Sequence, residues 1–158
     1  MIAQAEQFAK YLSMPSHVVA KIQSLVFDRK GSDPLERGDE LVFVVASWLL
    51  QWNLFDLAAA IQILRQHRAS LAEAGRTVLE SIDNTEITAP CRYFTIADGR
   101  YFFFDDKFWD TAECRYLESI QRPTWFLQAS PELLFLNYLR LVKDDRHAKP
   151  DDSPAAGG

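Results

Sequence analysis

One segment carries polar side chains at a spacing suited to binding. If residues 16–24 form a helix, positions three, four and eight apart share one face, and that face presents hydroxyl, imidazole and ammonium groups around one small alanine. Its members are Ser16, His17, Ala20, Lys21 and Ser24. Such groups hydrogen-bond to base edges and phosphates. Three cations follow in the next loop, where they would contact a phosphate backbone: Arg29, Lys30 and Arg37.

Two short helices must position this face. Apolar residues at three- and four-residue steps predict a helix over 2–12. Ser13-Met14-Pro15 interrupts it, and proline suits the first turn of a second helix over 15–27. Ser13 occupies the turn, and Ala9 is small enough for a close crossing of the helices. The expected buried set is Phe8, Leu12, Met14, Val19 and Ile22. This spacing predicts a helix-turn-helix, whose second helix enters a major groove.

The rest of the first half is also predicted to be helical. A polar loop over 28–38, which contains glycine and proline, separates the helix pair from a helix over 39–52. Asp56 caps a further helix that continues to residue 67. The spacing of Ser70 and Glu73 forms a capping box, which predicts a separate helix over 70–82.

Residues 4–68 resemble the winged helix-turn-helix of MerR-type regulators. The resemblance rests on "QFAKYLSMPSHVVAKIQ", a basic loop, and "GDELVFVVASWLLQWNLFDLAAAIQILRQH". The positions that match the family pattern are Asp39, Leu41, Leu49, Asn53, Leu57, Ala60 and Leu64. The resemblance implies a homodimeric transcription regulator that binds double-stranded DNA through its recognition helix and a wing. Asn53 stands where the family has a glycine, and an α+β segment replaces the family's long dimerisation coil.

The second half is expected to contain a small sheet. Aromatic runs over 91–96 and 101–104 flank Asp98-Gly99, a strong hairpin signal, and a third strand is expected over 124–128. A largely buried helix should begin at Ser130. We therefore expect an α+β fold, with a mainly α winged helix-turn-helix-like domain over 1–83 and an aromatic-rich hairpin and helix segment over 84–143. The latter would dimerise or bind an effector or protein partner, and a disordered tail would cover 144–158.

Composition excludes several classes of protein. The chain has 158 residues and a net charge of −5, and the acidic excess lies in residues 80–158, which argues against a non-specific nucleic-acid coat. No apolar run is long enough to cross a bilayer. Cys91 and Cys114 lack a disulfide or metal spacing, so we expect reduced thiols and a cytoplasmic protein. No catalytic or phosphate-loop motif is found, so neither an enzyme nor a metal or cofactor site is predicted.

Three functions remain open from the sequence, the third being a small-molecule-sensing domain with no DNA role. The first is a DNA-binding transcriptional regulator that docks the second helix in the major groove. The alternative is a protein-interaction module, such as an anti-repressor or a phage-type inhibitor, in which the same helices bind a protein instead of DNA. The acidic second half favours the alternative, and the polar face around Lys21 favours DNA.

Overall fold

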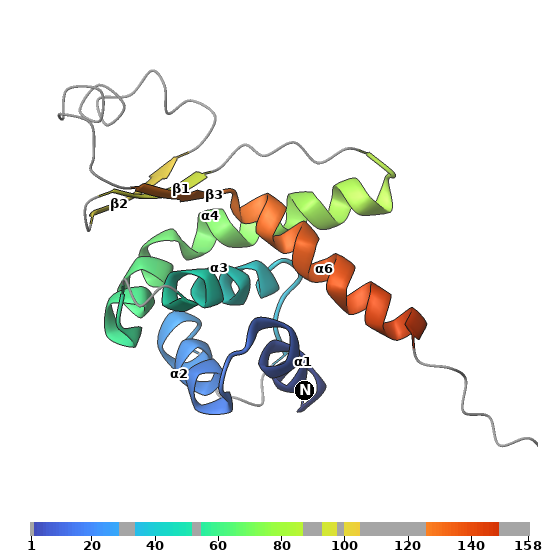
Figure 1. The fold of residues 1–158 in the computed structure, drawn as a ribbon, viewed down its shortest axis with the longest axis horizontal. Coiled ribbons are helices and arrows are strands. Elements are labelled where there is room, and N and C mark those ends of the chain that lie inside the picture. The colour runs from blue at the N-terminus through green and yellow to red at the C-terminus, as the bar shows by residue number, and fades with distance from the viewer. Residues whose placement is uncertain are drawn as a thin grey trace, which may run out of the picture.

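The structure is a computed structural model, and its fold is drawn in Figure 1. The residues that it describes are 2–28, 34–51, 55–86, 93–97, 100–104 and 126–148.

Helices α1 (Ile2–Leu12) and α2 (Ser16–Val26) form the first pair. Pro15 precedes α2 in an extended conformation, with φ −60° and ψ 145°, and its carbonyl oxygen accepts hydrogen bonds from the N–H groups of Val18 and Val19 at 2.9 and 3.1 Å. Pro15 is thus the N-cap residue, and the second helix begins at Ser16, one residue later than predicted.

Helix α3 (Glu40–Gln51) is the centre of the fold. Six consecutive residues, from Leu41 to Ala46, are buried, so neighbours cover the helix on nearly all sides. It packs against α1, α4 and α6. Figure 1 shows it between α4 on one side and the α1–α2 pair on the other.

Helix α4 (Leu57–Asp83) is one continuous helix, so the prediction of two helices meeting before Ser70 is wrong. Asp56 does cap it, since its carboxylate accepts a hydrogen bond of 2.7 Å from the N–H of Ala59. Buried residues continue from Leu64 to Leu71 and Ala74, and no proline interrupts the segment. Leu64 and Leu71 are two helical turns apart, and half-buried His67 and Arg68 lie between them, so the inward stripe keeps its register across the expected break and favours one long helix over two capped ones.

Helix α6 (Pro131–Ala148) packs against α1, α3 and α4. Ser130 caps it: its hydroxyl accepts from the N–H of Leu133 at 3.3 Å and donates to Glu132 at 3.0 Å. Phe135, Tyr138 and Val142 belong to the same core as residues of α1 to α4. Residues on both sides of the expected domain boundary at 83/84 therefore pack into one core. The helix also continues to Ala148, so a disordered tail does not begin at 144, and residues 149–158 lie outside the described part.

Three short strands form an antiparallel sheet in the order β2-β1-β3. They are β1 (Tyr93–Ala97), β2 (Arg100–Phe104) and β3 (Phe126–Ala129). Thr95 of β1 pairs with Phe102 on one side and with Gln128 on the other. The polypeptide enters α6 directly after β3 (Figure 1).

The expected α+β fold class is wrong, because the part of the structure whose side-chain packing is described is all-helical and consists of the five helices α1, α2, α3, α4 and α6. The buried residues whose side chains the structure describes come from these helices and the residues joining them, such as Met14 and Phe27. The apolar faces of α3, α4 and α6 cover one another in this helical core. Within the described residues, no helix has both the length and the hydropathy of a membrane span.

Candidate nucleic-acid interface

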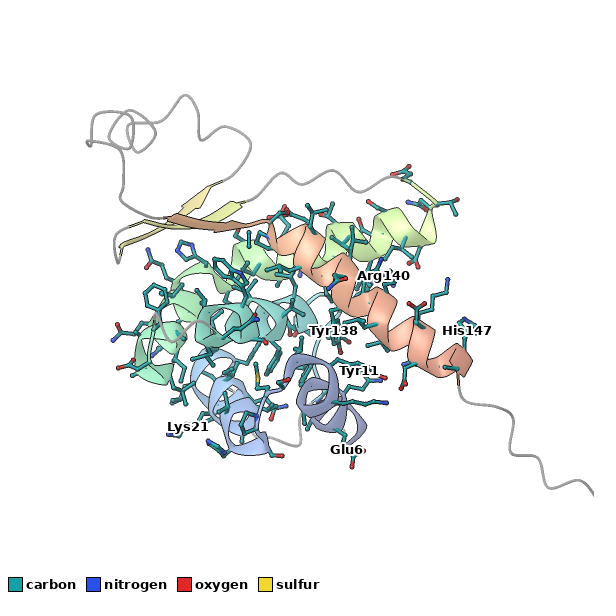
Figure 2. All side chains as sticks on the ribbon, viewed as in Figure 1. Glu6, Tyr11, Lys21, Tyr138, Arg140 and His147 are labelled. Atoms are coloured by element: carbon teal, nitrogen blue, oxygen red, sulfur yellow. The ribbon has the colours of Figure 1, made fainter. Side chains whose placement is uncertain are left out.

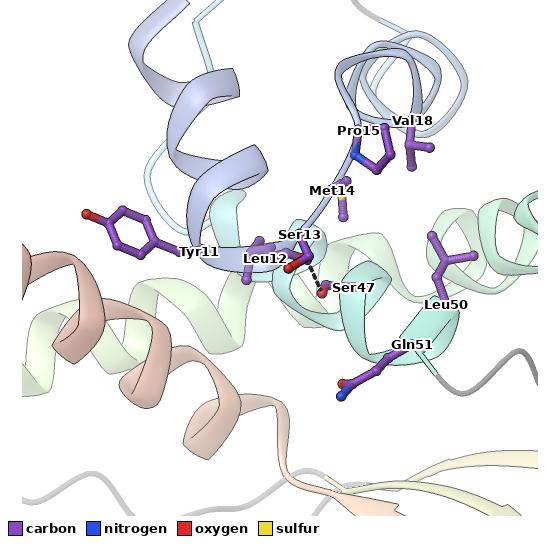
Figure 3. A pocket seen from close by; sticks show the side chains of 9 residues that line it. All are labelled: Tyr11, Leu12, Ser13, Met14, Pro15, Val18, Ser47, Leu50 and Gln51. Atoms are coloured by element: carbon purple, nitrogen blue, oxygen red, sulfur yellow. Dashed lines mark hydrogen bonds between the residues drawn. The ribbon is translucent and has the colours of Figure 1, made fainter.

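The turn between α1 and α2 contains three residues, Ser13 to Pro15. Ser13 has a φ of 51°, the left-handed conformation for which glycine is the usual residue. The hydroxyl of Ser47 on α3 donates a hydrogen bond of 2.8 Å to the carbonyl oxygen of Leu12. In Figure 3 α2 is seen almost end-on while α1 runs across the view, so the two axes are steeply inclined. This geometry matches a helix-turn-helix.

The inner side of this helix pair is fixed by aromatic stacking. Phe8 on α1 stacks on Phe43 of α3, with ring centroids 4.4 Å apart, and Phe27 at the end of α2 lies 5.6 Å from the same ring. Val19 and Ile22 of α2 are buried beside them. Of the predicted buried set only Leu12 is half-exposed. The platform that holds α2 is therefore well packed.

The outer side of α2 carries the predicted polar face. All five residues predicted there are exposed: Ser16, His17, Ala20, Lys21 and Ser24. Figure 2 shows Lys21 on α2, well apart from Arg140 and His147 of α6. The helix thus brings these five residues together on one solvent-facing surface, which we call the α2 face.

The predicted loop cations are placed only in part. Arg29 and Lys30 lie outside the described residues. Arg37 is exposed and forms an ion pair with Asp83, the last residue of α4. Its guanidinium is therefore directed to the end of α4, and this pairing would have to open or be shared for Arg37 to contact a phosphate.

Ala9 does not have its predicted role. Its side chain is exposed, so it cannot be the small residue at the crossing of α1 and α2. The adjacent Phe8 makes the buried contact instead. Helices α1 and α2 still contact each other directly, and the Phe43 ring of α3 joins them from the inner side through Phe8 and Phe27.

A pocket of about 340 Å³ lies beside the turn, between the start of α2 and the end of α3. Pro15 and Val18 line it on one side, and Leu50 and Gln51 on the other (Figure 3). Its walls mix apolar side chains with the polar groups of Ser13, Ser47 and Gln51. The pocket leaves the N-terminal turn of α2 open to solvent.

Charged groups also join α1 to α6. The carboxylate of Asp145 accepts a hydrogen bond of 2.5 Å from the Tyr11 hydroxyl and forms an ion pair with Lys10. The hydrogen bond to Asp145 raises the pKa of both Tyr11 and Lys10. Burial raises the pKa of Tyr138, whose ring meets that of Tyr11 edge-on with centroids 6.4 Å apart. Helix α6 is thereby tied to the first helix of the pair.

Sequence analysis missed the arginines of α4. Arg65, Arg68 and Arg76 line one hollow of about 400 Å³ with the segment that precedes α3. Their spacing along one helix face was a usable signal, but it was hidden by the prediction of two helices. Within the described residues, no group of three or more histidine, cysteine or acidic side chains is arranged to hold a metal ion.

Comparison with known proteins yields no match to a family model, a curated protein or a solved structure. The interpretation of this surface therefore rests on its own geometry and chemistry.

Proposed function

We propose that this protein is a cytoplasmic, DNA-binding transcriptional regulator, a divergent helix-turn-helix protein of the MerR-like kind. Helix α2 would lie in the major groove, with Ser16, His17, Ala20 and Lys21 toward base edges. Serine, histidine and lysine supply the donors and acceptors that such readout requires. Arg29, Lys30 and Arg37 would contact the phosphate backbone.

One observation carries this proposal: a polar face is exposed to solvent on a helix whose opposite side is buried in the core. Val19 and Ile22 are 1% and 0% exposed, whereas Ser16, His17 and Lys21 on the same helix face solvent. Groove readout needs a rigid helix that presents polar side chains outward. The three-residue turn with left-handed Ser13 supports the same reading.

A homodimer would strengthen a contact that is small for one chain. Two copies would place their recognition helices in successive major grooves about one helical turn apart. We expect a palindromic site from such an assembly. Sedimentation at increasing concentration would measure the dimer directly.

A protein-binding role is the second candidate, and Leu25 favours it. Leu25 is 46% exposed and follows Ser24 directly along α2. An exposed leucine beside a polar face favours a protein partner, because the centre of a protein interface buries apolar side chains. In that case the α2 face would bind a protein and not DNA.

In the deciding experiment, the DNA fragments that bind the full-length protein are selected from a random duplex library. Affinity for the selected duplex and for random duplex is then measured by fluorescence anisotropy over a range of salt concentrations. DNA binding predicts a preference for the selected duplex and a steep loss of affinity with salt. Equal affinity for both duplexes, or no binding at low salt, would reject the regulator.

Matched variants connect the binding to the α2 face. Lys21→Ala should weaken binding, whereas Lys143→Ala removes a lysine of α6 that is also exposed and should leave affinity unchanged. His17→Ala should relax sequence preference more than it lowers affinity for random duplex. If Lys143→Ala weakened binding as much as Lys21→Ala, the contact would lie elsewhere.

A further inference from the structure

Three arginines lie along one face of α4. Arg65 and Arg68 are three residues apart and Arg76 follows two turns later, so successive turns bring their side chains to the same side. Ala69 and Ala72 lie between them. Short side chains flanked by long ones leave a depression with a basic rim, which we call the α4 hollow.

The α4 hollow is closed on its other side by the segment that precedes α3. Its volume is about 400 Å³, and Glu36 and Asp39 also line it. Asp39 is only 2% exposed, and its carboxylate accepts a hydrogen bond of 3.1 Å from the N–H of Glu36. Three cations thus face two carboxylates, one of which is buried and bonded to the backbone. The hollow keeps a net positive charge.

The ion pairs that the structure shows between described residues do not include the arginines of α4. In the part of the chain that the structure describes, ion pairs join Lys10 to Asp145 and Arg37 to Asp83, and neither involves this stripe. Arg65 and Arg76 are exposed. Exposed guanidinium groups without an acidic partner suit an anion, and their planar fork fits two phosphate oxygens.

Arg68 connects the α4 hollow to the recognition helix. Its guanidinium carbon lies 4.8 Å from the centroid of the Phe27 ring, and Phe27 is the C-terminal cap of α2. The hollow is therefore next to the end of α2. Helix α2 has 11 residues and is about 16 Å long. A duplex that held α2 in its groove would therefore have part of its backbone near the C-terminal end of α2, which Arg68 contacts.

We propose that the α4 hollow binds phosphodiester oxygens of the duplex whose groove α2 reads, with Arg65 and Arg76 as the phosphate ligands. This proposal rests on the DNA-binding function proposed above. Arg68 would act mainly by holding the end of α2 through its contact with Phe27. The hollow would add affinity without sequence preference, because phosphates are the same at every base pair.

The test measures the salt dependence of DNA affinity for Arg65→Gln, Arg76→Gln and the double variant. Each lost phosphate contact should lower the slope of log affinity against log salt by about 0.9, which is about a fivefold loss near physiological salt. The loss should be equal for the selected and the random duplex. Arg140→Gln removes an exposed arginine of α6 and should leave the slope unchanged; Figure 2 places Arg140 well away from α2.

Arg65→Lys and Arg76→Lys separate the effect of the positive charge from the effect of the arginine side chain on the structure of α4. A lysine keeps the cation that releases counterions, so both variants should retain most of the slope. Helical content and thermal unfolding of every variant verify that α4 is intact. If the wild-type protein binds DNA and the double glutamine variant has the same salt slope, the proposed role of the hollow is wrong, while the DNA-binding function is not affected. Absence of wild-type binding at low salt would overturn the DNA-binding function, and this inference with it.

Discussion

Gly38 and Gly75 lie against each other in backbone contact. A Cβ atom added to Gly75 would lie 2.3 Å from the carbonyl oxygen of Gly38 and 2.8 Å from its Cα. Gly38 also has a φ of 93°, which L side chains rarely adopt. The segment that leads into α3 therefore rests directly on the middle of α4. Asp39, which follows Gly38, is one of the residues that line the α4 hollow.

Gly75→Ala should destabilise the protein. In an open helix this change stabilises by about 1 kcal/mol, but here the new methyl group meets backbone atoms that cannot rotate away. We expect a net loss of about 1–3 kcal/mol in the free energy of unfolding. Denaturant unfolding measures it. Ala69→Gly, at an exposed position of the same helix, measures the effect of helix propensity alone. A gain in stability for Gly75→Ala would contradict the backbone contact between Gly38 and Gly75.

Phe43→Ala should be among the most damaging core substitutions. The ring is buried between Phe8 and Phe27, so its removal opens a cavity and separates α1 and α2 from α3. Truncation of a buried phenylalanine costs about 3–5 kcal/mol. Phe43→Leu should cost less because it refills part of the volume. Leu25→Ala, at a 46% exposed position, should change stability by no more than about 0.5 kcal/mol, and equal losses for Leu25→Ala and Phe43→Ala would argue against this core.

The contact between α1 and α6 should weaken at alkaline pH. The hydrogen bond to Asp145 raises the pKa of Tyr11 above 10.0 and that of Lys10 above 10.5. The protonated forms are therefore favoured by folding, so their contribution is complete below the ordinary values and is lost as pH rises through the folded-state pKa values. Unfolding free energies between about pH 8 and pH 11 test this.

Asp145→Asn is the matched variant for that measurement. It removes the carboxylate that both groups use, so the alkaline loss attributable to Tyr11 and Lys10 should become smaller. Burial also raises the pKa of Tyr138. The unfolding free energy of the Asp145→Asn variant should therefore still fall somewhat at alkaline pH. The same alkaline slope in Asp145→Asn and in the wild type would rule out the carboxylate as its source.

Acidification should destabilise the fold through His67. Burial lowers the pKa of His67 below 6.5, so the unfolded chain binds a proton more readily than the folded one. The contribution is complete above pH 6.5 and is lost as pH falls from that value to the folded-state pKa. His67→Gln should therefore show a shallower loss of stability over this interval. Parallel pH profiles for the two proteins would exclude His67.

Local patterns predicted much of the helical part. The break at Ser13 to Pro15, the cap at Asp56 and the inward positions of Phe8, Val19 and Ile22 follow from backbone preference and spacing. The exposed positions of Ser16, His17 and Lys21 follow from the same periodicity. Ala9 was misplaced because a small residue is compatible with both a close crossing and an open surface, and only the packing of Phe8 distinguishes them.

The sequence by itself determined where α1 and α2 begin and end and which side of α2 is polar, because these depend on neighbours a few residues away. Only the tertiary structure decided that α4 continues through Ser70, that α6 completes the helical core, and that three arginines share one hollow. Those outcomes depend on contacts between residues far apart in the chain, such as Gly38 with Gly75 and Tyr11 with Asp145. No local pattern records such contacts.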